Sequence, residues 1–281
     1  MAIDILDAFE REQQPLDFVI PGFLAGTVGA LVAPGATGKS YWALEAAMGV
    51  ACSVAGGDLL ELKPDSTGPA VYLAAEDPEI VVKRRLHAIG EHLPPGAREI
   101  ISERVLIEPL LGTGFNIMDE RHLGRAIAYC AGARLVVIDT LSRIHTLDEN
   151  SNGDMSLVFA ALERLAASTG AAVMFLHHTS KAASFGNQTD HQHASRGASL
   201  LTDNARFGAA LIRMAPEEAE EYGVVDEVRG HFVKLVVPKN NYGAEIGERW
   251  YRRHPGGVLR PAVLERKRKR KQGGRRNGYS G

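Results

Sequence analysis

Hydrophobic residues along this chain fall into short, nearly unbroken runs that are separated by longer segments of mixed character. The runs are rich in aliphatic and β-branched residues and lack the alternation of a half-exposed strand. They therefore predict strands that are buried on both faces of a sheet. Five such strands are expected, at Thr27–Ala33, Ala70–Ala75, Val105–Glu108, Leu135–Ile138 and Ala172–Leu176.

The segments between these runs predict helices. They cover about Lys39–Ala55, Pro78–His92, Arg121–Ala131 and Met155–Ser168. Strands that alternate with helices imply βαβ crossovers, so we expect an α/β fold with a mostly parallel central sheet.

The last part of the chain has a different pattern, in which predicted strands follow one another through short links. We expect these strands to pair antiparallel at one edge of the sheet. They are Ala205–Met214, His231–Val237, Arg249–His254 and Gly257–Leu259.

The start of the chain predicts a short amphipathic helix over residues 1–14, and Pro15 and Pro21 then mark an exposed connection to the first strand. The simplest organisation has three parts. These are an N-terminal helical arm (1–15), a single α/β domain (16–262) and a tail (263–281).

Composition places only broad limits on the class of protein. The chain has 281 residues, of which 45% are hydrophobic, as in an ordinary globular protein. No apolar run reaches the roughly 18–20 residues of a membrane span, and the start lacks the basic and apolar pattern of a signal peptide. We therefore expect a cytoplasmic protein without a membrane partner. Cys52 and Cys130 are too few for a disulfide framework and are expected in the core.

Charge is distributed unevenly along the chain. The net charge is −2, but residues 265–281 carry eight Lys and Arg side chains against one Glu, a net +7 that leaves −9 on residues 1–264. The tail also contains glycines and few apolar residues, so it is expected to be disordered by itself. Such a tail is either a solubilising end or a non-specific contact for nucleic-acid phosphates, and its charge density favours the contact.

The strongest chemical signal is the segment Ala33–Ser40 (APGATGKS), which follows a predicted strand and opens a predicted helix. This is the context of a phosphate-binding P-loop, whose backbone N–H groups and helix N-terminus face the phosphates. Lys39 is expected to reach the β- and γ-phosphates of ATP, and Ser40 to bind Mg²⁺. Ala33 stands where the pattern usually has glycine, at a position that begins the loop. The predicted nucleotide-binding residues are Pro34, Gly35, Ala36, Thr37, Gly38, Lys39 and Ser40.

Acidic residues follow two of the predicted strands. Asp139 ends the run Leu135–Ile138, at the sheet edge where α/β folds bind ligands, and is expected to hold Mg²⁺ through its water shell. The alternative is an acid that caps the following turn. Glu76 could orient the water that attacks the γ-phosphate. Asp77, which precedes Pro78, predicts a helix N-cap with proline at the first helical position.

A histidine pair, His177 and His178, follows a third strand to the same edge. One histidine could detect the γ-phosphate and report it to the following loop, although such pairs are more often structural. A zinc site with His191 and His193 is a further alternative. It is disfavoured because no cysteine or carboxylate stands at ligand spacing.

Residues 181–196 have little hydrophobicity and no periodicity, and a loop this long is usually functional or disordered. We expect it to bind single-stranded DNA, with basic groups on the phosphates and an aromatic ring on a base. The predicted contacts are Lys181, His191, His193 and Arg196, with Phe185 as the stacking ring.

Arg206 and Lys239 adjoin the predicted edge strands. A cation in such a place can reach the nucleotide of a neighbouring subunit and stabilise the charge that develops on its γ-phosphate, as an arginine finger does. The alternative for each is an ordinary surface cation.

Taken together, these residues resemble those of the RecA-like motors, and most closely the RepA-type hexameric replicative helicases of mobilisable plasmids. The resemblance covers nearly the whole chain, from ILDAF to GGVLRPAVLER. Its most specific stretches are Val71–Asp77 (VYLAAED), Phe175–Lys181 (FLHHTSK), Ala194–Arg206 (ASRGASLLTDNAR), Asn240–Ala244 (NNYGA) and Arg249–His254 (RWYRRH).

The resemblance implies a ring of six subunits with ATP and Mg²⁺ at the subunit interfaces and 5′→3′ movement on single-stranded DNA. It implies that Glu76 is the catalytic carboxylate, Asp139 the Walker-B acid and His178 the γ-phosphate sensor. Arg206 resembles the finger that acts in trans. Asn241 stands where related helicases often carry a second basic residue beside Lys239. A plasmid initiator and a primase are the partners that such a helicase would serve.

Two other functions are compatible with the same residues. One is an ATP-controlled DNA-binding switch or helicase-loader-like ATPase that does not unwind DNA processively. The other is a recombinase that forms open filaments, which requires an interface that does not close.

Overall fold

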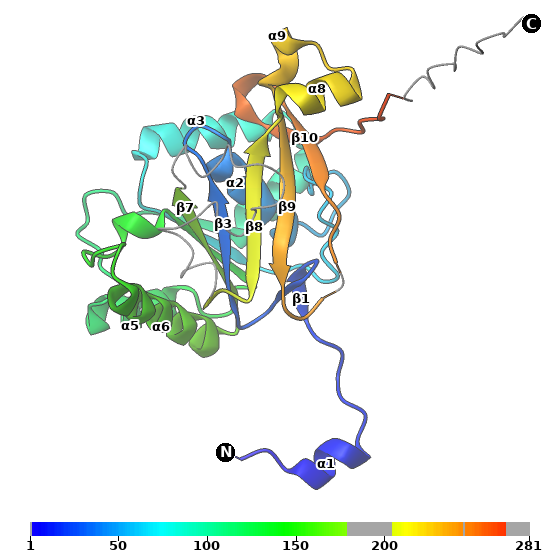
Figure 1. The fold of residues 1–281 in the computed structure, drawn as a ribbon. Helices are drawn as coiled ribbons and strands as arrows, with labels where there is room; N and C mark the ends of the chain where they lie inside the picture. The colour runs from blue at the N-terminus through cyan, green and yellow to red at the C-terminus, as the bar shows by residue number, and fades with distance from the viewer. Residues whose placement is uncertain (1, 179–203, 244, 268–281) are drawn as a thin grey trace, which may run out of the picture.

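The computed structural model describes residues 2–178, 204–243 and 245–267 and has a layered α/β fold (Figure 1). Its main sheet has nine strands in the order β11-β10-β9-β8-β3-β7-β6-β4-β5. The strands are β3 (Val28–Ala33), β4 (Ala70–Ala74), β5 (Val105–Pro109), β6 (Leu135–Asp139), β7 (Ala172–His178), β8 (Phe207–Arg213), β9 (Phe232–Asn240), β10 (Arg249–Arg253) and β11 (Leu259–Pro261).

The predicted parallel core is confirmed. Strands β3, β7, β6, β4 and β5 pair parallel to one another. The helices between them are α2 (Lys39–Ala51), α3 (Glu79–Gly90), α4 (Pro95–Arg104), α5 (Glu120–Tyr129) and α6 (Asn152–Thr169), with the 3-10 turn η1 (Leu141–Arg143) after β6.

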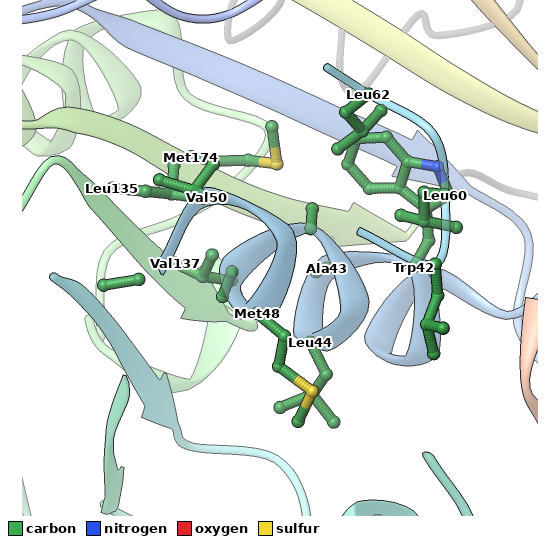
Figure 2. Close-up of a cluster of buried hydrophobic side chains, with 14 of the residues drawn as sticks. Trp42, Ala43, Leu44, Met48, Val50, Leu60, Leu62, Leu135, Val137 and Met174 are labelled. Carbon is green, nitrogen blue, oxygen red and sulfur yellow. The ribbon is translucent and has the colours of Figure 1, made fainter. Parts of the chain in front are cut away.

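The inner strands β3, β4, β6 and β7 are buried on both faces, as their apolar runs predict. The same prediction is wrong for β5, which lies at the edge of the sheet and is only partly covered, with Leu106 47% exposed. In β6, Leu135 and Val137 belong to the cluster on the α2 side, whereas Val136 and Ile138 belong to the cluster on the α6 side. Figure 2 shows Leu135 and Val137 beside the α2 side chain Val50. Because side chains alternate across a strand, each aliphatic residue of the run is needed to fill one of the two cores.

The antiparallel strands near the C-terminus are also present, with one difference from expectation. Strands β9, β10 and β11 pair antiparallel, but β8 pairs parallel with β3 and antiparallel only with β9. The prediction that Ala205–Met214 enters the sheet antiparallel to its neighbours is thus wrong on the β3 side. The order of strands along a sequence does not show whether two consecutive strands are joined by a hairpin or by a crossover. Because β7 and β8 both pair parallel with β3, their connection is a crossover. Two helices, α8 (Pro216–Tyr222) and α9 (Asp226–Arg229), connect β8 to β9, and η3 (Pro255–Gly257) connects β10 to β11.

The chain before the sheet differs from the predicted exposed connection. Residues 18–24 form a two-stranded hairpin of β1 (Phe18–Ile20) and β2 (Phe23–Leu24), in which Val19 and Phe23 are fully buried. The apolar side chains outweigh the turn signal of Pro21, because Phe23 stacks on Phe207 at 4.8 Å between ring centroids.

The N-terminal arm contains α1 (Ile5–Glu10), whose apolar side chains are exposed. Ile5, Leu6 and Phe9 retain 65%, 63% and 81% of their accessible surface. Figure 1 shows α1 projecting away from the sheet. Among residues 2–178, 204–243 and 245–267, no helix is both long and apolar enough to cross a membrane.

Candidate nucleotide-binding site

The P-loop connects the central strand β3 to α2, as the sequence predicts. Gly38 is the N-cap residue of α2 and has a φ of 110°, a conformation that an L side chain rarely adopts. Ala36 also has a positive φ, of 58°, which is unusual for a residue with a β-carbon. The loop therefore turns through two left-handed positions before the helix begins.

Lys39 lies inside this turn, with only 5% of its surface exposed. Its Nζ donates to the Ala33 carbonyl at 3.2 Å and lies 3.0 Å from Nδ1 of His178. Burial lowers the pKa of Lys39, while the nearby charges of Asp139 and Glu76 raise it. The ammonium group is thus surrounded by the residues that the sequence analysis assigns to the phosphate site.

His178 bridges the lysine to Glu76. Its Nε2 lies 3.2 Å from both carboxylate oxygens of Glu76. An ammonium group only donates, so Nδ1 accepts from Lys39 and the neutral ring carries its hydrogen on Nε2, which donates to Glu76. Three residues that are far apart in the sequence are brought into one hydrogen-bonded row.

Asp139 lies at the carboxyl end of β6 and is 3% exposed. It accepts hydrogen bonds from the Tyr72 hydroxyl and from Ser40, and burial raises the pKa of its carboxyl group. Its Oδ1 atom is buried and has no hydrogen-bond partner among the residues that the structure describes. A hard cation with a water shell suits such an orphaned carboxylate oxygen beside a hydroxyl. Ser40 and Asp139 therefore fit Mg²⁺, as the sequence analysis expects.

Asp77 does not cap the following helix. The N-cap residue of α3 is Pro78, which has an extended ψ of 150° and no capping side chain. The Asp77 carboxylate instead lies 2.7 Å from the Arg85 guanidinium, on the second turn of that helix. The predicted capping role was wrong because this partly buried ion pair directs the carboxylate away from the helix N-terminus.

Two arginines on the outer strands also contact the P-loop, and the sequence analysis missed both. Arg213 ends β8 and donates to the carbonyl oxygens of Gly35 and Ala36 at 3.2 and 2.9 Å. Arg253 ends β10 and donates to those of Thr37 and Ala36 at 2.7 and 3.4 Å. Arg213 lies in no motif of the sequence, and Arg253 lies in the stretch Arg249–His254 without a role being assigned to it. Only the parallel direction of both strands relative to β3 places their carboxyl ends at the P-loop.

Arg206 and Lys239 lie near each other, but at the end of the strands that is opposite to the P-loop. Arg206 is exposed and immediately precedes β8, while Lys239 on β9 pairs with Gly208. Because strands rise about 3.3 Å per residue, the length of β8 places roughly 20 Å between Arg206 and the edge that carries the P-loop. Within one subunit, neither cation joins Lys39, Glu76 and Asp139.

Several predicted residues lie outside the part of the chain that the structure describes. They are the proposed DNA contacts Lys181, Phe185, His191, His193 and Arg196, and the end of the basic tail from residue 268 onward. The alternative zinc site depends on His191 and His193 as well. Within the described residues, no three His, Cys, Asp or Glu side chains are arranged to hold a metal ion.

Comparison with known proteins identifies relatives for the sequence and the fold. A family model described as an AAA domain matches residues 2–184. The RadB recombinase structure has a TM-score of 0.54 at 14% identity, over 86% of this chain and 93% of that chain. Another solved structure, described as an ATPase domain, has a TM-score of 0.59 at 13% identity, over 92% of this chain and 96% of that chain.

A DnaB-like replicative helicase, described with its primase interactions, has a TM-score of 0.61 at 15% identity. The match covers 85% of this chain but only 58% of the helicase chain. At such identities the likeness concerns the fold, which is that of a RecA-like ATPase core.

Proposed function

Because the chain belongs to the AAA domain family and has the fold of a RecA-like P-loop ATPase, we propose that it is a replicative DNA helicase of the RepA type. In this proposal it forms a hexameric ring, moves 5′→3′ on single-stranded DNA and serves plasmid replication. The proposed partners are a primase, with which the DnaB-like helicase is described as interacting, and a plasmid initiator.

One observation carries the proposal: the cations expected to complete the ATP site lie at the wrong edge of the sheet for their own subunit. Lys39, Glu76 and Asp139 converge at the carboxyl edge, whereas Arg206 and Lys239 lie at the amino edge. A head-to-tail interface brings these two edges of neighbouring subunits together, and it produces a ring when its rotation closes. Each ATP site would then use residues of two subunits.

The residues act in the following way in this proposal. The P-loop amides and Lys39 bind the phosphates, and Glu76 orients the attacking water and accepts its proton. Mg²⁺ at Ser40 and Asp139 would neutralise charge on the β- and γ-phosphate oxygens. His178 contacts both Lys39 and Glu76, so a γ-phosphate that binds Lys39 would change the hydrogen bonds of His178. In this way His178 would signal the state of the site to the segment that follows β7.

The proposal assigns single-stranded DNA to that following segment. Its phosphate contacts are Lys181, His191, His193 and Arg196, and Phe185 stacks on a base. The basic tail supplies additional, non-specific phosphate contacts. These assignments come from the sequence pattern and from the position of the segment directly after His178.

Strand displacement on a forked DNA duplex tests the proposal. Wild-type protein with ATP should release the labelled strand from a fork with a 5′ tail, and Lys39→Ala should not. Lys83→Ala is the matched control, because this exposed lysine forms an ion pair with Glu79 on its own helix, away from the P-loop. Displacement that survives Lys39→Ala would contradict the proposal. DNA-stimulated ATP hydrolysis without displacement would instead favour the DNA-binding switch or loader.

A further inference from the structure

The P-loop is held from outside by two guanidinium groups that belong to different strands. Both converge on the carbonyl oxygen of Ala36, Arg213 at 2.9 Å and Arg253 at 3.4 Å. Each also binds one flanking carbonyl, that of Gly35 or Thr37. Three consecutive carbonyl groups of the loop are thus bound by two cations.

Ala36 is the residue of the loop that most needs such support. Its φ of 58° lies in the left-handed region, where a β-carbon approaches the following carbonyl oxygen. This conformation is disfavoured by about a factor of ten for alanine but is readily adopted by glycine. Ala36 is itself exposed, so packing of its own side chain does not hold it in place.

The two arginines have no competing partner among the residues that the structure describes. Neither forms an ion pair with a carboxylate in residues 2–178, 204–243 or 245–267. Burial and the neighbouring charge of Arg213 both lower the pKa of Arg253. Two like charges held side by side are unfavourable, and the shared carbonyl oxygens are what offsets this repulsion.

We propose that Arg213 and Arg253 are positioning residues that hold Ala36 in its left-handed conformation and thereby keep the P-loop in the shape that binds phosphate. The inference rests on the ATP site alone and does not require the protein to be a helicase. It also links the outer strands β8 and β10 to the affinity of that site. Neither arginine needs to touch the nucleotide.

Binding of a fluorescent ATP analogue to DNA-free protein tests this inference. Arg213→Ala and Arg253→Ala should each weaken binding about tenfold, the effect of losing a charged hydrogen bond. In steady-state hydrolysis, the KM for ATP should rise by a similar factor while kcat changes less. Arg252→Ala is the matched control, because this exposed neighbour on β10 lies over the Phe232 ring and should change binding less than about twofold.

Ala36→Gly distinguishes positioning from direct contact with the nucleotide. Glycine needs no help to adopt the left-handed conformation, so the loss caused by Arg253→Ala should shrink to about threefold or less in the Ala36→Gly background. An undiminished loss in that background, or no loss in the wild-type background, would overturn the proposal. Thermal unfolding shows whether each variant is folded. If Arg253→Ala does not fold, the same comparison between the wild-type and Ala36→Gly backgrounds is made with Arg213→Ala.

Discussion

At the scale of single residues, the site is organised around the row Lys39–His178–Glu76. The positions of Lys39 and Glu76 follow from motifs in the sequence, because a P-loop fixes its lysine and a buried strand delivers an acid to its carboxyl end. Contacts such as those of Tyr72 with Asp139 depend on which strands are neighbours. No local pattern shows which strands are neighbours, so Asp139 was predictable but its contact with Tyr72 was not.

Glu76→Gln should separate ATP binding from hydrolysis. The amide keeps the size of the side chain and can still meet His178, but it cannot accept a proton from water. We expect the hydrolysis rate to fall by about 10²–10⁴-fold while ATP affinity changes little. Paired measurements of single-turnover hydrolysis and nucleotide binding test this expectation.

Glu79→Gln is the control for that substitution, because Glu79 is exposed and forms an ion pair with Lys83 on the same helix. It should leave the hydrolysis rate near that of the wild type. If Glu76→Gln retains a rate within a few fold of the wild type, another residue must activate the water.

At the scale of elements, most of the parallel core was predictable because its inner strands β3, β4, β6 and β7 are buried on both faces and read as apolar runs. The β1–β2 hairpin and the direction of β8 were not. Short strands carry little periodicity, and strand direction is set by the crossover that precedes it. Helix α4 was also missed, since only Ala97 and Ile101 of its side chains are buried.

The contact between α2 and β11 predicts a specific pH dependence of stability. Glu45 on α2 is fully buried and accepts a hydrogen bond from the Leu259 backbone at 2.9 Å, while its Oε2 has no hydrogen-bond partner within the described part of the chain. Burial raises the pKa of Glu45 to about 8. The folded protein therefore holds a proton that the unfolded chain releases near pH 4.5.

Because the folded-state pKa is the higher one, this contribution to stability is present at low pH and is lost as the pH rises towards 8. The free energy of unfolding of the wild type should fall relative to that of Glu45→Gln between about pH 5 and 8, by up to about 1.4 kcal/mol per pH unit. Urea unfolding at several pH values measures the difference. Parallel profiles for the two proteins would show that Glu45 is ionised in the folded state.

At the scale of the whole molecule, the proposed helicase requires ATP sites that are shared between subunits. Lys39→Ala removes the phosphate side of a site and Arg206→Ala removes the cation supplied by the neighbour, so each variant alone should hydrolyse ATP poorly. An equal mixture should regain hydrolysis, because about a quarter of randomly formed interfaces combine an intact Lys39 with an intact Arg206. A mixture no more active than its components would place Arg206 outside the site.

The exposed apolar face of α1 leads to a second prediction at this scale. We propose that Ile5, Leu6 and Phe9 pack on a neighbouring subunit, since isolated helices of this length are not stable in water. Deletion of residues 1–15 should shift the oligomer towards smaller species in sedimentation experiments at micromolar concentration. An unchanged distribution of masses would show that the arm has another role.

In the proposed function, the protein is a DNA-driven motor that works as a closed ring. The most direct test measures the ATP hydrolysis rate of the purified protein with and without single-stranded DNA, together with its mass in solution with Mg²⁺ and ATP. We expect a closed multimer with the mass of six subunits, and we expect single-stranded DNA to raise its rate of ATP hydrolysis. A monomer whose rate of ATP hydrolysis is the same with and without DNA would contradict the proposed motor. Only the nucleotide-binding site would then remain supported.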